Sequence, residues 1–237
     1  MQHRITIFRH GAKSGTAPRH VSTLRPERGR IIGWSSAAAR RNAEFLQSVD
    51  YDQLTGLGLA FTGTVRDCPS APDDWKRTRS NFFKRLRRLG LIRAHDVTEW
   101  QRRGVPHLHG MLFFPECSGA EYIGLVCAVR DAWLAVTAGY GTSARGVHIA
   151  PMTDAAGWAE YTAKHAARGV NHYQRSKDNM PASWTNGTGK MWSVLGEWPV
   201  CEPMGFQADF KAFTAYRRLC RSWRKSTARA SGNPRHI

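Results

Sequence analysis

The chain has 237 residues, which is enough for one sizeable domain with additions or for two small domains. Its 35 Lys and Arg residues against 18 Asp and Glu residues give a net charge of +17, and a globular protein this basic usually binds a polyanion, most often a nucleic acid. The sequence has no apolar run of roughly eighteen residues, no apolar leader after Met1 and no Cys-x-x-Cys pair among its 5 cysteines, so we expect no membrane span, no signal peptide and a reducing compartment.

Residues 1–33 are rich in Gly, Arg, Ser and Pro and show little periodicity, so we expect an irregular basic arm. The alanine-rich stretch over residues 35–48 favours a helix, because alanine has the highest intrinsic helix propensity. Ser35 or Ser36 is the expected N-cap of that helix.

Residues 57–65 predict a buried strand that carries Thr62 and Thr64 on one face. After two prolines, residues 75–89 predict a helix with an apolar stripe made of Trp75, Phe82, Leu86 and Leu89. The other side of this helix carries the basic residues Lys76, Arg77, Arg79, Lys84, Arg85, Arg87 and Arg88. Because a solvated face needs only one or two such charges, we expect this surface to contact phosphates.

Two strand-like stretches, residues 95–101 and 105–114, flank a turn in which Gly104 supplies the positive φ of a three-residue hairpin loop. That turn places Glu99 opposite His107, with Cβ atoms about 5 Å apart. His109 shares the face of His107, because strand side chains alternate between faces. Two imidazoles and one carboxylate leave coordination positions open, as a catalytic metal ion requires. The alternative is an ordinary surface hairpin with polar residues.

The capping-box spacing after Ser118 opens another helix, and residues 146–152 predict the next strand. Thr153 or Asp154 can cap a helix that ends at Gly169. The elements then follow the order βαββαβ with a further helix. This order predicts an α+β protein with a ferredoxin-like antiparallel sheet and helices packed on one face.

The C-terminal stretch over residues 206–226 predicts a final helix, and residues 227–237 are expected to be disordered. We therefore expect a single domain over residues 34–226. Trp192 and Trp198 are candidates for stacking on bases, although an aromatic residue in such a position is equally compatible with the core.

Tyr161 and Lys164 are three residues apart on a predicted helix and therefore share a face. A tyrosine beside a metal-bound phosphate can act as a nucleophile and form a covalent ester with DNA. Because the phenol has an ordinary pKa of about 10, a neighbouring ammonium group would help by favouring the phenolate. Taken alone, the pair is also compatible with an ordinary helix surface.

Together, Glu99, the stretch from Gly104 to His109 and the later Tyr-x-x-Lys helix closely resemble the HUH endonucleases, and most closely the rolling-circle replication initiators of plasmids and single-stranded DNA phages. The resemblance covers roughly residues 35–200. It implies the HUH fold with N- and C-terminal helical additions. It also implies a divalent ion, Mg or Mn, on His107, His109 and Glu99, with Tyr161 as the nucleophile and Lys164 assisting it.

By the same resemblance, Tyr161 nicks single-stranded or hairpin origin DNA, keeps the 5′ phosphate and releases a 3′-OH that can prime synthesis. A host helicase and polymerase would complete replication in the bacterial cytoplasm, since the chain has no helicase domain. The strand around Phe61 is similar to the family motif that contacts DNA beside the site. The expected DNA-contacting residues are Thr62, Thr64, Arg79, Lys84, Arg87, Arg102, Arg103 and Trp192.

One departure from the family pattern is His165, which stands where some phage initiators have a second tyrosine, so we expect a single-tyrosine enzyme. A relaxase or transposase with the same chemistry is one alternative, but relaxases tend to place their tyrosine near the N-terminus, whereas Tyr161 follows the histidines. A non-catalytic nucleic-acid-binding domain is a second alternative. A metal-dependent hydrolase without covalent attachment is a third.

Overall fold

The computed structural model describes residues 3–16, 29–152 and 155–230. Its contacts divide the chain into two compact units. The larger unit is Arg28–Val200, and the smaller unit combines Met1–Glu27 with Cys201–Ile237. Within the described residues, no helix is both long enough and apolar enough to cross a bilayer.

A five-stranded antiparallel sheet forms the centre of the larger unit, in the order β6-β3-β5-β4-β7. Its strands are β3 (Leu57–Thr64), β4 (Arg93–Trp100), β5 (Pro106–Phe114), β6 (Val147–Met152) and β7 (Trp192–Leu195). β5 lies in the middle of the sheet, and every one of its residues is buried. The mixed α+β class that the sequence predicts is therefore confirmed.

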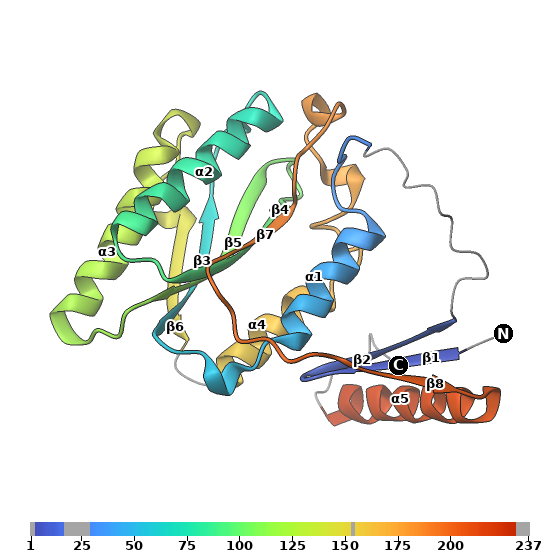
Figure 1. Ribbon diagram of the computed structural model, residues 1–237. Coiled ribbons are helices and arrows are strands. Elements are labelled where there is room, and N and C mark those ends of the chain that lie inside the picture. The colour runs from blue at the N-terminus through green and yellow to red at the C-terminus, as the bar shows by residue number, and fades with distance from the viewer. Residues whose placement is uncertain (1–2, 17–28, 153–154, 231–237) are drawn as a thin grey trace. The chain divides into compact units, whose positions relative to one another are not determined.

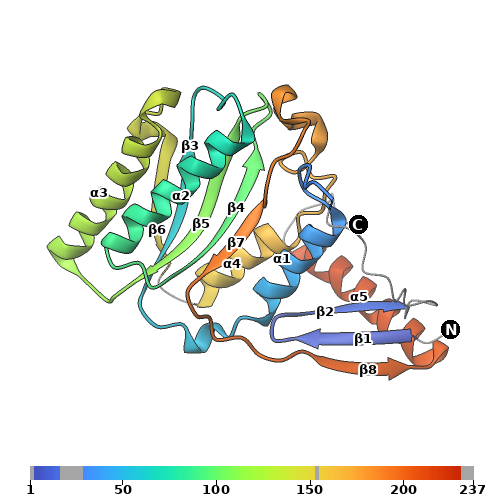
Figure 2. The same cartoon turned by 45° about the horizontal axis from the view of Figure 1, so that its top comes forward.

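The helices α2 (Pro72–Arg88) and α3 (Gly119–Val136) cover one face of this sheet, as Figure 1 and Figure 2 both show. The rings of Phe82 in α2 and Trp133 in α3 meet edge to face, with centroids 5.1 Å apart. Both rings belong to the main core, which also contains Leu108 of β5. Because aromatic side chains bury a large apolar area, this core fixes both helices against the strands.

The helices α1 (Ser36–Ser48) and α4 (Ala155–Ala166) cover the opposite face (Figure 1). There Leu46 and Trp158 share a second core with Met111 of β5. The sequence predicts helices on one face of the sheet, and the structure adds α1 and α4 on the other face, because alternate residues of β5 present apolar side chains to this side as well, and these need cover. The histidines of β5 share this second face, so α1 and α4 enclose the candidate site.

The boundaries of α1 and α2 follow local capping chemistry. Ser35 is the N-cap of α1, as predicted, and its hydroxyl accepts a hydrogen bond from a backbone N–H at 3.1 Å. α2 begins earlier than predicted, because Pro72 suits a first helical turn and the Asp74 carboxylate accepts a hydrogen bond from the Ala71 backbone N–H at 3.2 Å. Leu89, expected on the apolar stripe of this helix, is instead its exposed C-cap.

Short 3-10 helices connect the main elements of the larger unit, at Tyr51–Gln53, Ala138–Tyr140, Ala144–Gly146, Lys177–Asn179 and Ala182–Trp184. The N-cap candidates of α4, Thr153 and Asp154, lie outside the described residues.

The smaller unit contains a three-stranded antiparallel sheet in the order β2-β1-β8 and a helix. These elements are β1 (His3–Phe8), β2 (Gly11–Thr16), β8 (Met204–Ala208) and α5 (Phe210–Ala230). The imidazole of His3 stacks on the ring of Phe213, with centroids 4.3 Å apart, and joins β1 to α5.

This smaller unit corrects the expected boundaries. Residues 3–16 form a hairpin rather than an irregular arm, and residues 201–230 belong to this unit rather than to a single domain over 34–226. The pairing of β1 with β8 joins the two ends of the chain, so local periodicity gives no sign of it. α5 includes residues 227–230, which were expected to be disordered, and residues 231–237 lie outside the described residues.

Candidate metal centre and nucleophile

The β4–β5 hairpin sets the positions of the candidate ligands. Its loop closes with hydrogen bonds from the Gln101 N–H to the Val105 carbonyl and from the Gly104 N–H to the Gln101 carbonyl, both at 2.9 Å. Gly104 adopts a φ of 69°, the left-handed conformation expected of it. Glu99 then pairs directly with His107, which confirms the register predicted from the sequence.

Glu99, His107 and His109 form a compact group of candidate ligands. One ligand atom from each lies within 4.8 Å of the other two, and all three residues are buried. The imidazoles of the two histidines are 4.4 Å apart between ring centroids. The structure therefore brings together the three side chains that the sequence singles out, in a geometry that can hold one divalent ion.

The nitrogen atoms of both histidines suit a metal ligand. The Thr62 hydroxyl is 2.8 Å from Nδ1 of His109, and Nε2 of that ring faces Oε2 of Glu99 at 3.6 Å. This Nε2 is buried and has no hydrogen-bond partner among the described residues. Nε2 of His107 accepts a hydrogen bond from the side-chain amide of Gln174 at 3.2 Å, so a metal ion at this nitrogen would have to displace that amide. A hydrogen bond at one ring nitrogen commonly fixes the other as a metal ligand.

The protonation states at the centre also favour a cation. Burial lowers the pKa of His107 to about 4 and lowers the pKa of His109 well below its ordinary value, so both rings are neutral near neutral pH. Burial works to raise the pKa of Glu99, but its interactions with His165, Arg175 and His109 outweigh burial and hold that pKa below its usual range. Neutral imidazoles and an ionised carboxylate are the forms that coordinate metals.

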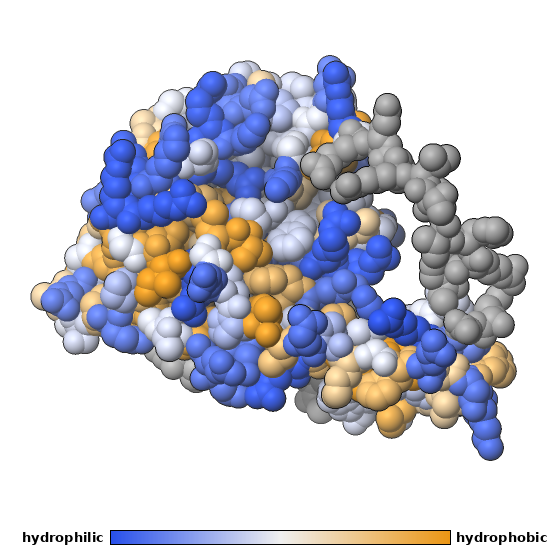
Figure 3. Space-filling model, in the orientation of Figure 1, coloured by the Kyte–Doolittle hydropathy of each residue, from blue (hydrophilic) through white to orange (hydrophobic). Residues whose placement is uncertain are grey.

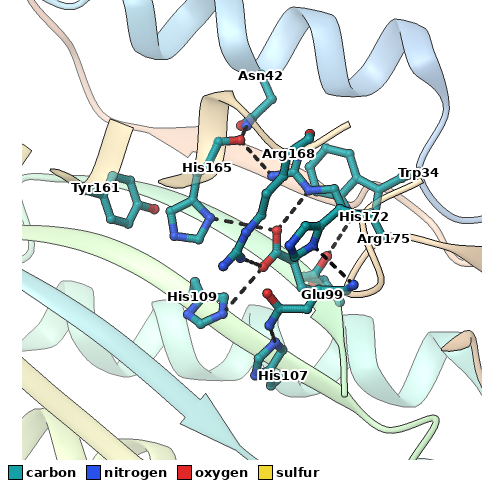
Figure 4. Close-up of polar contacts among 12 residues, drawn as sticks. Trp34, Asn42, Glu99, His107, His109, Tyr161, His165, Arg168, His172 and Arg175 are labelled. Carbon is teal, nitrogen blue, oxygen red and sulfur yellow. Dashed lines mark hydrogen bonds and ion pairs between the residues drawn. The ribbon is translucent and has the colours of Figure 1, made fainter. Parts of the chain in front are cut away.

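Two arginines hold the Glu99 carboxylate (Figure 4). Nε of Arg175 donates to Oε1 of Glu99 at 2.9 Å, and Nη1 of Arg168 donates to Oε2. The Arg175 guanidinium is itself fully buried and lies over the ring of Trp34, 3.9 Å from the ring centroid. Both arginines follow α4 in a segment without periodicity, so the sequence gives no signal that they reach Glu99.

Tyr161 lies on α4 and faces the same enclosed space. Its hydroxyl is 2.9 Å from Nδ1 of His95, and Nε2 of His95 is 2.8 Å from Oδ1 of Asn42. Figure 4 shows His165 between Tyr161 and Glu99. The rings of Tyr161 and His165 are 4.5 Å apart, and Nδ1 of His165 is 3.8 Å from Oε1 of Glu99. The tyrosine predicted as nucleophile is therefore close to the ligand group, and the sequence missed His95 and Asn42, which hold it.

Burial determines the protonation state of Tyr161. It raises the pKa of Tyr161 well above its ordinary value, and the negative charges of Asp96 and Glu99 raise it further. The structure therefore holds Tyr161 as a neutral phenol near neutral pH. Lys164, the predicted assisting residue, is exposed.

A cavity of about 250 Å³ gives access to this face of the sheet. Its lining includes Thr62, His109, Tyr161, Lys164 and His165. One candidate ligand, the candidate nucleophile and the candidate assisting lysine thus border the same space. A phosphate group placed there would meet all of them.

Several residues expected to contact DNA have other partners within the larger unit. Arg79 forms an ion pair with the buried Asp96 and donates to the Lys190 carbonyl at 2.8 Å. Arg103 donates to the backbone carbonyls of residues 65 and 66. Trp192 is half-buried, with its ring centroid 6.2 Å from that of Phe45.

Of the remaining residues expected to contact DNA, some have partners within the protein and others are exposed. The Arg102 guanidinium lies 5.1 Å from the ring centroid of Tyr173. Thr64 lies opposite His107 and accepts a hydrogen bond from the Gln101 side chain at 3.3 Å. Lys84 and Arg87, in contrast, are exposed on α2.

Comparison with known proteins found neither a family model nor a solved structure that matches the chain. Curated relatives do match. A protein of Xylella fastidiosa strain 9a5c, whose name assigns it provisionally to replication, is 50% identical over 235 residues, which cover 97% of this chain and 81% of that protein. The replication-associated protein of Pseudomonas phage Pf3 is 47% identical over 235 residues, which cover 98% of this chain and 84% of that protein. The chain therefore belongs to the family of replication proteins that these relatives represent.

Proposed function

We propose that this protein is an HUH-type nicking enzyme that initiates rolling-circle replication by cutting and rejoining one strand of origin DNA. The observation that carries the proposal is the gathering of Glu99, His107 and His109 within 4.8 Å, with Tyr161 on the same enclosed face of the sheet. The strand order β6-β3-β5-β4, with α2 and α3 as the crossing helices, supports the ferredoxin-like HUH fold.

Glu99, His107 and His109 would hold the divalent ion, Mg or Mn. Such an ion polarises a non-bridging oxygen of the scissile phosphate and so makes the phosphorus more electrophilic. Arg168, which donates to Glu99, adds a further positive charge beside this position. Thr62 orients the His109 ring through its hydrogen bond at 2.8 Å.

Tyr161 would attack the phosphorus and retain the 5′ phosphate, while the bond to the 3′ oxygen breaks and that oxygen leaves as the 3′-OH. The hydrogen bond to His95 would position the phenol, because Nδ1 of a neutral imidazole accepts the phenolic O–H while Nε2–H donates to Asn42. Burial lowers the pKa of His95 to about 3, so this ring stays neutral and orients Tyr161 without taking its proton. The phenolic proton would pass to solvent in the cavity, and solvent would supply the proton that the departing 3′ oxygen gains. Lys164 borders the same cavity, where its ammonium group can neutralise phosphate charge.

The proposed substrate is single-stranded or hairpin DNA at a replication origin, with a host helicase and polymerase completing replication. The net charge of +17 supports a polyanionic substrate, and the relatives named for replication support its place in that process. With His165 rather than a second tyrosine one position after Lys164, the chain would act through a single nucleophile.

The decisive experiment incubates the protein and Mn²⁺ with a randomised pool of single-stranded and hairpin oligonucleotides. Covalent adducts are recovered under denaturing conditions, and the modified peptide is identified by mass spectrometry. We expect DNA on Tyr161 and complete loss of the adduct in Tyr161→Phe. Tyr173→Phe is the matched control, because Tyr173 is 45% exposed and lines no part of the cavity, and it should keep the adduct.

Other outcomes of this experiment favour the alternatives. Cleavage that survives Tyr161→Phe without an adduct would indicate a metal-dependent hydrolase. Tight binding with intact DNA in every variant would indicate a non-catalytic nucleic-acid-binding protein. Adducts on a different tyrosine would overturn the assignment of the nucleophile.

A further inference from the structure

A second surface of the larger unit lies along β7, the strand at one edge of the central sheet. Two cavities of about 560 Å³ and 410 Å³ border this strand. They share Ile31, Lys190 and Ser193 in their linings, so together they form one groove, here called the β7-edge groove. None of the candidate metal ligands lines it, and neither does Tyr161.

The β7-edge groove is strongly basic. Its exposed cations are Lys76, Lys84 and Arg87 of α2, together with Arg41 and Lys190. Lys84 and Arg87 follow Lys76 by 8 and 11 positions, so these three side chains lie on one face of the helix. Figure 3 shows hydrophilic side chains gathered over α2.

These positive charges are not neutralised by the rest of the described protein. Among residues 3–16, 29–152 and 155–230, no acidic side chain forms an ion pair with any of the five cations. The acidic residue in the lining is Asp73, at the start of α2. Unpaired like charges that line one groove repel each other unless an anion lies between them, so the groove suits a polyanion.

Among the residues that the structure describes, the groove has no fully exposed aromatic ring. Trp75 and Phe83 contribute to its lining but are buried, with exposed fractions of 1% and 7%. Trp192 also lines it, but is half-buried and packs near Phe45 and His95, with ring centroids 6.2 Å and 6.1 Å away. Proteins that bind single strands combine basic grooves with aromatic stacking, whereas binding to a duplex backbone depends mainly on phosphate contacts.

We infer that the β7-edge groove binds the phosphate backbone of duplex DNA. The inference rests on the proposed function in one respect, because it identifies this duplex as the double-stranded arm of the origin beside the nicked strand. The groove would then position the DNA, while the cavity at Tyr161 receives the strand to be cut. Phosphate contacts of this kind fix orientation and carry little sequence information.

The test compares two triple variants of α2 that remove the same charge. Lys76→Gln, Lys84→Gln and Arg87→Gln together remove the cations of the groove. Arg77→Gln, Arg85→Gln and Arg88→Gln together form the matched control, since these residues lie on the same helix but do not line the groove. Fluorescence anisotropy measures the binding of a short blunt duplex and of a single strand of equal length, over a range of salt concentrations.

We expect the groove variant to bind the duplex more weakly and to make the slope of log affinity against log salt shallower by about 3, or about 0.9 for each lost phosphate contact. The control should change that slope by less than about 1, since each lost contact accounts for about 0.9. Circular dichroism of both variants establishes that they are folded. Equal weakening by the two variants would overturn the inference, as would a larger loss for the single strand than for the duplex.

The assay measures binding without cleavage, so its result is separable from that of the nicking experiment. A protein that forms no adduct but binds duplex through the groove would overturn the proposed function and leave this inference standing. A protein that forms the Tyr161 adduct but binds duplex equally well in both variants would overturn this inference and leave the proposed function standing.

Discussion

The carboxylate of Glu99 receives hydrogen bonds from two guanidinium groups while it lies among histidine rings. A buried carboxylate without such partners would take up a proton, because burial alone disfavours its charged form. Arg168 and Arg175 therefore keep Glu99 ionised and fix its orientation. These are the two conditions that a carboxylate ligand of a metal ion has to meet.

Asn42 supports the buried pair of His95 and Tyr161. Its Oδ1 lies 2.8 Å from Nε2 of His95, and Asn42 and His95 are both fully buried. Truncation would leave a buried imidazole N–H without a partner, which costs about 1–3 kcal/mol. We expect Asn42→Ala to lower the free energy of unfolding by about that amount, measured by urea denaturation.

Asn81→Ala is the matched control for Asn42→Ala. Asn81 is exposed on α2, and alanine has the higher helix propensity, so the free energy of unfolding should stay constant or rise slightly. Similar losses in both variants would show that the hydrogen bond to His95 contributes nothing.

Single residues were predictable where the rule that places them is local. Glu99, His107 and His109 share a face because strand side chains alternate and one glycine turn sets the register. Arg168 and Arg175 reach Glu99 only because the chain after α4 folds back over the sheet, and no local spacing encodes that path. The depth of burial that raises the pKa of Tyr161 is likewise a property of the packed layers.

The β4–β5 hairpin is the element on which the candidate metal centre depends. Gly104 has a φ of 69°, and a Cβ added there would meet nothing within 4 Å, so the cost of alanine is conformational alone. That cost is about 1–2 kcal/mol for a residue in the left-handed region. We expect Gly104→Ala to lower the free energy of unfolding by about 1 kcal/mol in urea denaturation, with the register of the hairpin unchanged.

We expect Gly124→Ala, in contrast, to raise the free energy of unfolding. Gly124 lies within α3, has open space at its Cβ position and has no positive φ. Alanine is favoured over glycine in a helix interior by about 0.5–1 kcal/mol, so this variant should be more stable than the wild type. Destabilisation by both variants would mean that the strain at residue 104 is not the cause.

Whole elements were predictable where a long periodic stretch carries its own boundaries. β3, α2 and β5 have clear apolar patterns, and the expected strands and helices formed there. β1 and β2 are short, and β1 gains its cover from α5 and β8 at the other end of the chain. Such pairing is invisible to any window of neighbouring residues.

At the scale of the whole molecule, a metal bound only by the folded state raises the melting temperature. A ligand at about 100 times its Kd stabilises the folded state by about 2.7 kcal/mol. We therefore expect Mn²⁺ to raise the melting temperature of the wild type in differential scanning fluorimetry, and EDTA to reverse the shift. His107→Ala should abolish the shift, because it removes one of the three candidate ligands.

His10→Ala is the control for metal binding. His10 lies between β1 and β2 of the smaller unit, outside the ligand group and outside the cavity that His109 lines, so its variant should keep the Mn²⁺ shift. Equal shifts in all variants would place the ion elsewhere on the protein and remove the support for a centre on Glu99.

The net charge of +17 predicts a polyanionic partner, and this agrees with a family whose members are named for replication, since bulk charge needs no knowledge of the fold. The division into two units was not predictable in the same way. It depends on which segments share contacts, and the first and last segments of the chain meet only in the folded protein.

One uninterrupted piece of chain carries Tyr161 on α4 and then delivers Arg168, Gln174 and Arg175 to the ligand group. An α-helix turns by about 100° for each residue, so one residue gained or lost between Tyr161 and the end of α4 at Ala166 would change the direction in which the chain leaves the helix towards Arg168. The tyrosine could keep its place while Glu99 lost its counter-charge. We therefore expect homologues of this protein to keep the length of that segment constant, even where its amino acids differ.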